Sequence, residues 1–354
     1  MKNTGKGLIM ESLKPIQFDT SKVSPKEKFT SVEMAKLWAT YMGNSLSQMI
    51  ISHFLQHVED EEIKTLLENA KGLTEDFMGK IKFFMENENF PVPQGYTNQD
   101  LNSAAPRLFE DEFYVHYLKY AAKAGLSIYA IALPLVMRLD IREFFIHCGM
   151  MTTELLSQIN GLLMGKGFII KPPVLPNPEK IDFVENKSYL DGFGHNLRPL
   201  HALEVTHLYD NIENNVTSKA LLIGFSQVAR TQQVRDFFIR GIEMTDKMVE
   251  QLKAKLHKEN LPSPALLDHL VTNSTIAPYS DKLMLSHKAD MFAMKIRSMG
   301  NSMAVNGRKD IGLLYGKALM NVALYAEDAA EILIGHGWLE QPPHAADRDK
   351  LASE

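Results

Sequence analysis

The chain contains one residue pair with the spacing of a metal-binding helix, in the segment Glu204-Val-Thr-His207. A glutamate and a histidine three positions apart lie on one face of a helix. Dinuclear metal sites in four-helix bundles need this motif on two helices, with a further carboxylate from each of the other two. No other acidic residue stands three positions before a histidine in the 354 residues. The motif alone therefore does not predict a dinuclear centre.

Four residues are weaker candidates for a metal site: His116, His287, Glu33 and Glu204. The two histidines are 171 positions apart, and so are the two glutamates. Histidines at a shared repeat position could bind a metal or carry a proton inside a helical cavity. A buried histidine hydrogen-bonded to a neighbour is the commoner arrangement, and helix capping accounts for the glutamates. We therefore predict no cofactor and keep metal binding at these four residues as an alternative.

Nucleophilic catalysis has little support in the sequence. Cys148 follows His147 directly, and adjacent helical residues do not face each other. A single cysteine also excludes an intramolecular disulfide and a cysteine-based zinc site. His53 and His57 lie one turn apart and could share a metal, although a solvated helix face is the simpler interpretation. No glycine-rich phosphate-binding motif occurs. The sequence favours a protein that is not an enzyme.

Composition limits the class of partner and the compartment. The net charge of -5 gives no reason to expect nucleic acid. The longest apolar stretch, residues 126–137, is shorter than the roughly 20 residues of a membrane span and contains Pro134. The N-terminal residues lack the apolar core of a signal peptide. We expect a soluble, cytoplasmic protein that binds other proteins, without a membrane span.

The elements that carry these residues occur twice. A shift of 171 positions aligns Asn44 with Asn215 and Phe54 with Phe225, and it places residues 88–93, ENFPVP, on residues 259–264, ENLPSP. After a one-residue deletion, Asp140-Ile141 falls on Asp310-Ile311. Because the register holds across the whole unit with one deletion, we predict a duplicated unit of about 170 residues.

Each unit is predicted to form four helices. Apolar residues recur at spacings of three and four, which is typical of a buried helix face; in the second helix of the first unit they are Ile63, Leu66, Leu67, Ala70, Leu73, Phe77, Ile81 and Phe84. Thr30 and Glu33 form a capping box at the first helix, and Asp140 can start the fourth. Gly167 and Gly337 can end the fourth helices in the left-handed conformation.

The connection between the second and third helices is long. About 18 residues, 89–106, could reach roughly 60 Å, and a helix of 27 residues measures about 40 Å. The fold class predicted is all-α: two tandem four-helix bundles with ferritin-like up-down topology and a long crossover. The predicted segments are a loosely ordered N-terminal segment (1–25), repeat 1 (26–171), a linker rich in proline and aromatics (172–199), repeat 2 (200–341) and a C-terminal tail (342–354).

Several sequence runs resemble one protein family. They are VEDEEIK (58–64), FPVPQGYT (90–97), APRLFEDEF (105–113), DIREFF (140–145), KALLIGFSQVA (219–229) and GWLEQPP (337–343). The family they resemble is a domain of unknown function from Bacillus-type spore-formers, usually present in two tandem copies. It is similar to spore coat protein F and grouped with ferritin-like folds. The resemblance implies a tandem helical bundle, with self-association or spore coat components as partners and association with the spore.

Two functions follow from these observations. The first is a non-enzymatic structural or interaction protein of a spore-forming bacterium, related to the spore coat. The alternative is a ferritin-like protein or enzyme that binds a small ligand or a metal inside one or both bundles. A dry, apolar bundle interior would favour the first, and a cavity with converging polar groups would favour the second.

Overall fold

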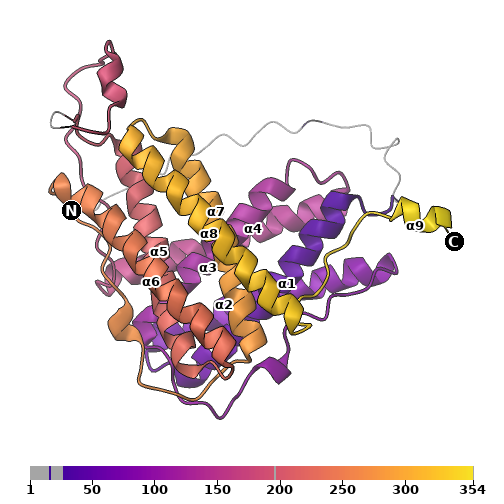
Figure 1. Ribbon diagram of the computed structural model, residues 1–354. Coiled ribbons are helices and arrows are strands. Elements are labelled where there is room, and N and C mark those ends of the chain that lie inside the picture. Colours follow the sequence, from indigo (N-terminus) through magenta and orange to yellow (C-terminus); the bar gives the residue numbers. More distant parts are fainter. Residues whose placement is uncertain (1–15, 17–26, 195–196, 354) are drawn as a thin grey trace, which may run out of the picture.

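The computed structural model describes residue 16 and residues 27–194 and 197–353, and these residues fold into helices (Figure 1). The described part of the chain holds nine α-helices, three short 3-10 helices and no strand. The α-helices are α1 (Ser31–His57), α2 (Glu61–Asn87), α3 (Asp111–Ala132), α4 (Leu139–Gly165), α5 (Ala202–Val228), α6 (Gln232–Lys258), α7 (Asp281–Val305), α8 (Lys309–Gly335) and α9 (Arg348–Ser353). The 3-10 helices are η1 (Asn98–Asp100), η2 (Lys187–Leu190) and η3 (Asp268–Leu270). The predicted all-α class is confirmed. The predicted N-terminal segment 1–25 lies, apart from Ile16, outside the described residues.

Hydrogen bonds at the helix ends establish the topology of the first bundle. The carboxylate of Asp111, at the start of α3, accepts the backbone N–H groups of Glu59 and Asp60 in the α1–α2 turn, at 3.0 and 2.8 Å. The carboxylate of Glu33, at the start of α1, accepts the backbone N–H of Arg138 at the start of α4. Consequently α2 and α3 run in the same direction. Residues 88–110 therefore run the length of the bundle, as the predicted crossover does.

The second bundle repeats this arrangement. Asp281, at the start of α7, accepts the N–H groups of Arg230 and Thr231 in the α5–α6 turn, at 3.0 and 2.8 Å. Glu204, at the start of α5, accepts the N–H of Arg308 before α8 at 2.9 Å. The same carboxylates thus fix the same connections in both copies.

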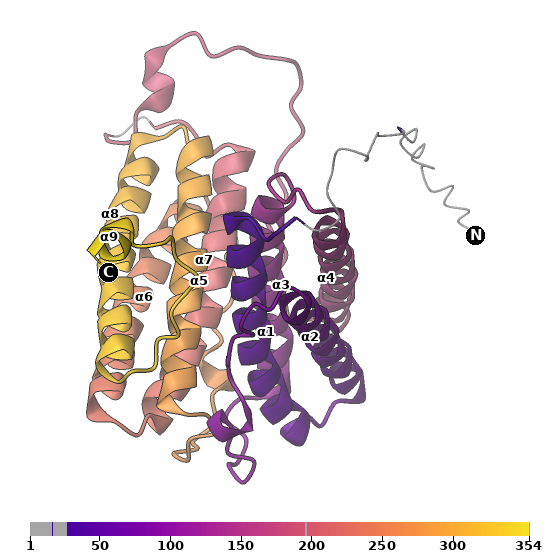
Figure 2. The ribbon, with the colours of Figure 1, turned by 90° about the vertical axis from the view of Figure 1, so that its right-hand side faces the viewer.

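The two bundles pack side by side, with α1 and α3 facing α5 and α7 (Figure 2). Helices α2 and α4 lie on the outer side of the first bundle, and α6 and α8 lie on the outer side of the second. The larger hydrophobic cluster joins both bundles and contains Phe54, Tyr117, Phe225 and Tyr279. A smaller cluster, which includes Phe77, belongs to the first bundle. The interface between the two bundles is therefore part of the hydrophobic core.

The two crossovers pair with each other across this interface. Leu101 forms an antiparallel bridge with Tyr279, and Phe109 forms one with Val271. Leu101 and Val271 are 170 positions apart, and so are Phe109 and Tyr279. Each bridge is therefore the repeat equivalent of the other. The crossovers thus lie on an approximate two-fold axis that relates the two copies.

The helix ends agree with the sequence prediction, with one exception. The Thr30 capping box is present on α1. Gly167 and Gly337 have φ values of 72° and 67°, and the residues after them donate to carbonyls in the last turn of the helix, as expected for left-handed helix ends. The prediction for Asp140 is wrong: Arg138 occupies the N-cap position of α4 and makes no side-chain cap.

Two buried glutamates connect the helix ends. Glu33 is fully buried and accepts the backbone N–H groups of Thr30, Met137 and Arg138 at 2.7–3.2 Å. Burial raises the pKa of this carboxyl, but the hydrogen bonds from Thr30, Arg138 and Met137 bring it below its ordinary value. Glu204 makes the equivalent bonds and also binds Arg198 at 2.8 Å. Both glutamates serve as backbone acceptors.

Replacing Glu33 by alanine is expected to lower the free energy of unfolding by about 2–4 kcal/mol, because several buried N–H groups lose their acceptor. Urea unfolding followed by circular dichroism measures the change. The matched control is Glu68→Ala on the exposed face of α2, which should change stability by about 0.5 kcal/mol or less. Equal effects of the two substitutions would contradict this role of Glu33.

Candidate functional site

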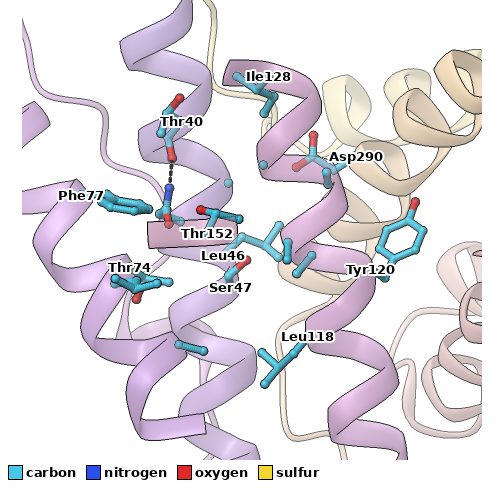
Figure 3. Close-up of a pocket in the computed structure, with 18 of the residues that line it drawn as sticks. Thr40, Leu46, Ser47, Thr74, Phe77, Leu118, Tyr120, Ile128, Thr152 and Asp290 are labelled. Carbon is cyan, nitrogen blue, oxygen red and sulfur yellow. Dashed lines mark hydrogen bonds between the residues drawn. The ribbon is translucent and has the colours of Figure 1, made fainter. Parts of the chain in front are cut away.

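The first bundle contains a partly open cavity of about 140 Å³ (Figure 3). The part of its wall formed by Ala39 and Gly43 of α1 and by Asp290 and Arg297 of α7 is called the cleft between α1 and α7. The whole wall of the cavity comes from all four helices of the first bundle and from α7 of the second. Most of the wall is apolar, with hydroxyl, amide and charged groups among the apolar side chains; the polar ones are Thr40, Asn44, Ser47, Thr74, Tyr117, Tyr120, Tyr129, Thr152, His287, Asp290 and Arg297. This is the combination expected of a small-molecule site.

The cavity lies where the first bundle carries smaller residues than the second, most clearly at Ala122 of α3 and Leu155 of α4. Ala122 is equivalent to Phe292, and Gly125 is equivalent to Lys295. Both large residues are buried inside the second bundle, where the ring of Tyr325 contacts Phe292 edge-on at 4.9 Å. The residue of α4 equivalent to Tyr325 is Leu155, which is smaller. At these positions the second bundle therefore has more side-chain volume than the first.

The cleft that leads to the cavity has a closed counterpart on the other side of the two-fold axis. There, Lys119 of α3 pairs with Glu213 of α5 at 2.6 Å. Lys123 also binds Asp210, and it donates to the side chain of Asn214 at 2.7 Å. These ion pairs join α3 to α5 along the interface.

On the cavity side, the equivalent positions carry small side chains. Ala39 and Gly43 of α1 replace Asp210 and Asn214, while Ala289 and Ala293 of α7 replace the two lysines. No ion pair between α1 and α7 occurs among the described residues. Figure 2 shows these two helices side by side at the centre of the molecule. The cleft is open here because the bridging side chains are absent.

One carboxylate lies in the cleft without a partner. Asp290 lines the cavity, and within the described residues it makes no hydrogen bond and no ion pair. A Cβ atom on Gly43 would lie 3.9 Å from its Oδ2, so α1 passes close to the carboxylate. The surrounding helices raise the pKa of Asp290 by burial, and Arg297 partly offsets this. Asp290 is nevertheless an exposed residue, so solvent reaches its carboxylate.

Other polar atoms on the cavity wall also lack partners. Among the described residues, the hydroxyl of Thr40, Nδ1 of His287 and Nε of Arg297 are buried without a hydrogen bond. The backbone carbonyl of Thr40 does accept a bond from the Asn44 amide, at 2.7 Å (Figure 3). Buried polar atoms are nearly always paired in proteins. Three such atoms lie on the wall of one cavity, where water or a polar group of a ligand would pair them.

The two candidate histidines have different environments. His287 Nε2 lies 3.0 Å from the hydroxyl of Tyr117, and burial lowers the pKa of this imidazole to about 3, so it is neutral. His116 Nε2 lies 3.2 Å from the carbonyl of Phe168. The prediction that they share a repeat position is wrong. Since α3 and α7 begin at Asp111 and Asp281, the equivalent of His287 is Tyr117.

The structure does not bring the four predicted metal ligands together. Glu33 and Glu204 accept backbone N–H groups at the starts of α1 and α5, and only His287 of the four lines the cavity. In the ranges that the structure describes, no three His, Cys, Asp or Glu residues form a group suited to a metal ion. His53 is buried with its ring against His57, and Cys148 is buried. Metal binding at the four candidates stays a prediction.

Comparison with known proteins identifies the repeat. A family model described as a protein of unknown function (DUF3231) matches residues 17–181 and again residues 188–351. The chain belongs to the DUF3231 family. Each DUF3231 match contains one bundle, which confirms the predicted duplication.

Part of this DUF3231 member is similar to a solved structure. The chain is similar to a protein provisionally named as a spore coat protein, from Bacillus halodurans C-125, with 18% identity and a TM-score of 0.38. The match covers 42% of this chain and 98% of the other. No curated protein matches the chain significantly. In the part of the chain that the structure describes, no helix is long and apolar enough to cross a membrane.

Two lysines of α7, Lys288 and Lys295, are buried in the second bundle of this DUF3231 member. Lys288 is fully buried, and its ammonium donates to the hydroxyl of Ser218 at 2.7 Å. Lys295 is 3% exposed, and its Nζ lies 5.7 Å from the ring of Phe292. Neither lysine pairs with a carboxylate among the described residues. Burial lowers the pKa of Lys295 to about 7 and lowers that of Lys288 as well.

These pKa shifts predict that stability rises with pH. Between about pH 7 and pH 10 the unfolded chain keeps a proton on Lys295 that the folded protein has lost, so raising the pH favours folding. Lys295→Met should therefore stabilise the protein near pH 7 and reduce this slope by about 1.4 kcal/mol per pH unit. Urea unfolding at pH 7.5, 8.5 and 9.5 tests this. Lys247→Met, on the exposed face of α6, is the control and should keep the slope. An unchanged slope in Lys295→Met would show that Lys295 stays protonated in the folded protein.

Proposed function

We propose that the protein binds a small molecule whose apolar part occupies the cavity of the first bundle. The observation that supports this is the difference between the two interiors: Ala122 and Leu155 line the cavity, whereas the equivalent Phe292 and Tyr325 pack against each other in the second bundle. The other copy shows that this fold can close the space. Among the two functions weighed from the sequence, ligand binding is thus the one favoured by the geometry.

The size of the cavity indicates the size of the ligand. A cavity of about 150 Å³ in another helical protein holds benzene, and the cavity here measures about 140 Å³. Left empty, it would cost about 3 kcal/mol at roughly 24 cal/mol per Å³. A ligand with an apolar part of about six to eight carbon atoms would recover part of that cost. We propose no reaction for it.

Assembly with other proteins is a second candidate, favoured by the linker. The linker arches away from both bundles (Figure 2) and carries exposed apolar side chains, among them Ile181, Phe183 and Phe193, which are 88%, 81% and 66% exposed. Apolar groups gathered on an exposed segment are typical of a protein contact. Association with spore coat components is a narrower form of this proposal, and it rests on the sequence resemblance.

Filling the cavity tests the ligand-binding proposal. Ethylbenzene should bind to the unmodified protein in a saturable manner, shifting amide signals of the first bundle in NMR spectra. Ala122→Phe introduces the residue of the second bundle and should abolish these shifts, because the ring takes the same space. Ala254→Phe, on the exposed face of α6, should leave binding unchanged. Binding that persists in Ala122→Phe would overturn the proposal.

A second variant closes the cleft without changing the cavity. Ala39→Asp with Ala293→Lys copies the Asp210–Lys123 pair from the other side of the two-fold axis. We expect the double variant to keep the helical circular dichroism spectrum and to slow the entry of ethylbenzene by at least about tenfold, measured by NMR exchange. Unchanged entry would show that ligands reach the cavity by another route.

A further inference from the structure

The cleft between α1 and α7 carries separated charges of opposite sign. Because the two helices run antiparallel, Lys36 of α1 and Arg297 of α7 lie toward one end, and Gly43 and Asp290 lie farther along. Asp290 and Arg297 are seven residues apart, which places them on the same face of α7, about 10 Å from each other along the axis. The cleft thus has a positive end formed by two half-buried cations and, about two helical turns along, an exposed negative position.

The positive end lacks a counter-ion. Neither Lys36 nor Arg297 forms an ion pair with any described residue, and Nε of Arg297 is buried without a hydrogen bond. Arg297 lines the cavity, and Lys36 lies seven residues before the lining residue Gly43, on the same face of α1. Burial and Arg297 both lower the pKa of Lys36. Two partly buried cations repel each other unless an anion lies between them. A carboxylate or phosphate would satisfy both.

The negative position is suited to an ammonium group. Asp290 has no ion-pair partner although Arg297 is on the same face of the helix. Tyr117 and Tyr120 line the same space, and aromatic rings near a carboxylate favour organic cations. The residues of α3 equivalent to Asp290 and Arg297 are Tyr120 and Ser127, which carry no charge. Both charges therefore belong to the open cleft alone.

We propose that the cleft selects a zwitterion, with an ammonium at Asp290, an anionic group at Lys36 and Arg297, and an apolar side chain in the cavity. This inference rests on the proposed ligand-binding function and specifies the ligand class. A simple cation would meet repulsion from Lys36 and Arg297, and a simple anion would meet repulsion from Asp290. A molecule that carries both groups, as amino acids do, complements all three residues.

Four compounds of the same skeleton test this directly. Phenylalanine carries both charges, 2-phenylethylamine only the positive one, 3-phenylpropionate only the negative one, and ethylbenzene neither. Titration calorimetry at pH 7.5 should show phenylalanine binding at least about tenfold more tightly than each of the others, since each charged contact adds a charge-assisted hydrogen bond.

Two conservative variants assign the contacts. Asp290→Asn should reduce the affinity for phenylalanine and 2-phenylethylamine while leaving ethylbenzene unchanged. Arg297→Gln should reduce the affinity for phenylalanine and 3-phenylpropionate in the same way. Glu250→Gln and Lys247→Gln, both on the exposed face of α6, are the matched controls and should change none of the affinities.

The outcomes separate this inference from the proposed function. If ethylbenzene binds but phenylalanine binds no more tightly, the zwitterion inference is overturned while the cavity remains a ligand site. If the neutral compound and the charged ones all fail to bind, the proposed function is overturned as well. An affinity for phenylalanine that survives both substitutions would also overturn the inference.

Discussion

The contact between the two bundles is the constraint on which the rest of the molecule depends. Each bundle leaves one apolar face, formed by α1 and α3 or by α5 and α7, and covers it with the corresponding face of the other. The paired crossovers close one end of this contact with backbone hydrogen bonds. Burial of that shared core stabilises both copies at once, so neither bundle has a complete core without its neighbour.

The two copies differ along that contact. The facing helices carry different residues on the two sides of the axis. Lys123 and Asp210 bind each other on one side, and Ala293 and Ala39 face the cleft on the other. Inside the bundles, Ala122 lines the cavity of the first copy, and Phe292 is buried at the equivalent position of the second. Ion pairs therefore join the bundles on one side of the axis, between α3 and α5, while the other side, between α1 and α7, is open.

The sequence was sufficient to predict the helices, the duplication and the length of the crossover, because apolar spacing, helix ends and loop length are local properties. Apart from His287, it did not identify the cavity residues. Asp290 and Arg297 have no motif around them, and their importance comes from facing α1, a helix more than 200 positions away. A comparison of the two copies offered one signal, since Gly125 is equivalent to Lys295 and Ala122 to Phe292. That signal was obscured by the one-residue deletion, which pairs His116 with His287 when a single shift is used throughout.

The unequal sides of the two-fold axis have a consequence for occupancy. A dimer of two identical bundles would present two equivalent clefts, and filling one could influence the other through their common interface. Here both bundles belong to one chain. The cleft between α1 and α7 is open, while the equivalent position between α3 and α5 is bridged by lysine and carboxylate side chains. In the ligand-binding proposal each polypeptide therefore holds one ligand in this cavity, and its saturation curve is a simple hyperbola without cooperativity within the chain.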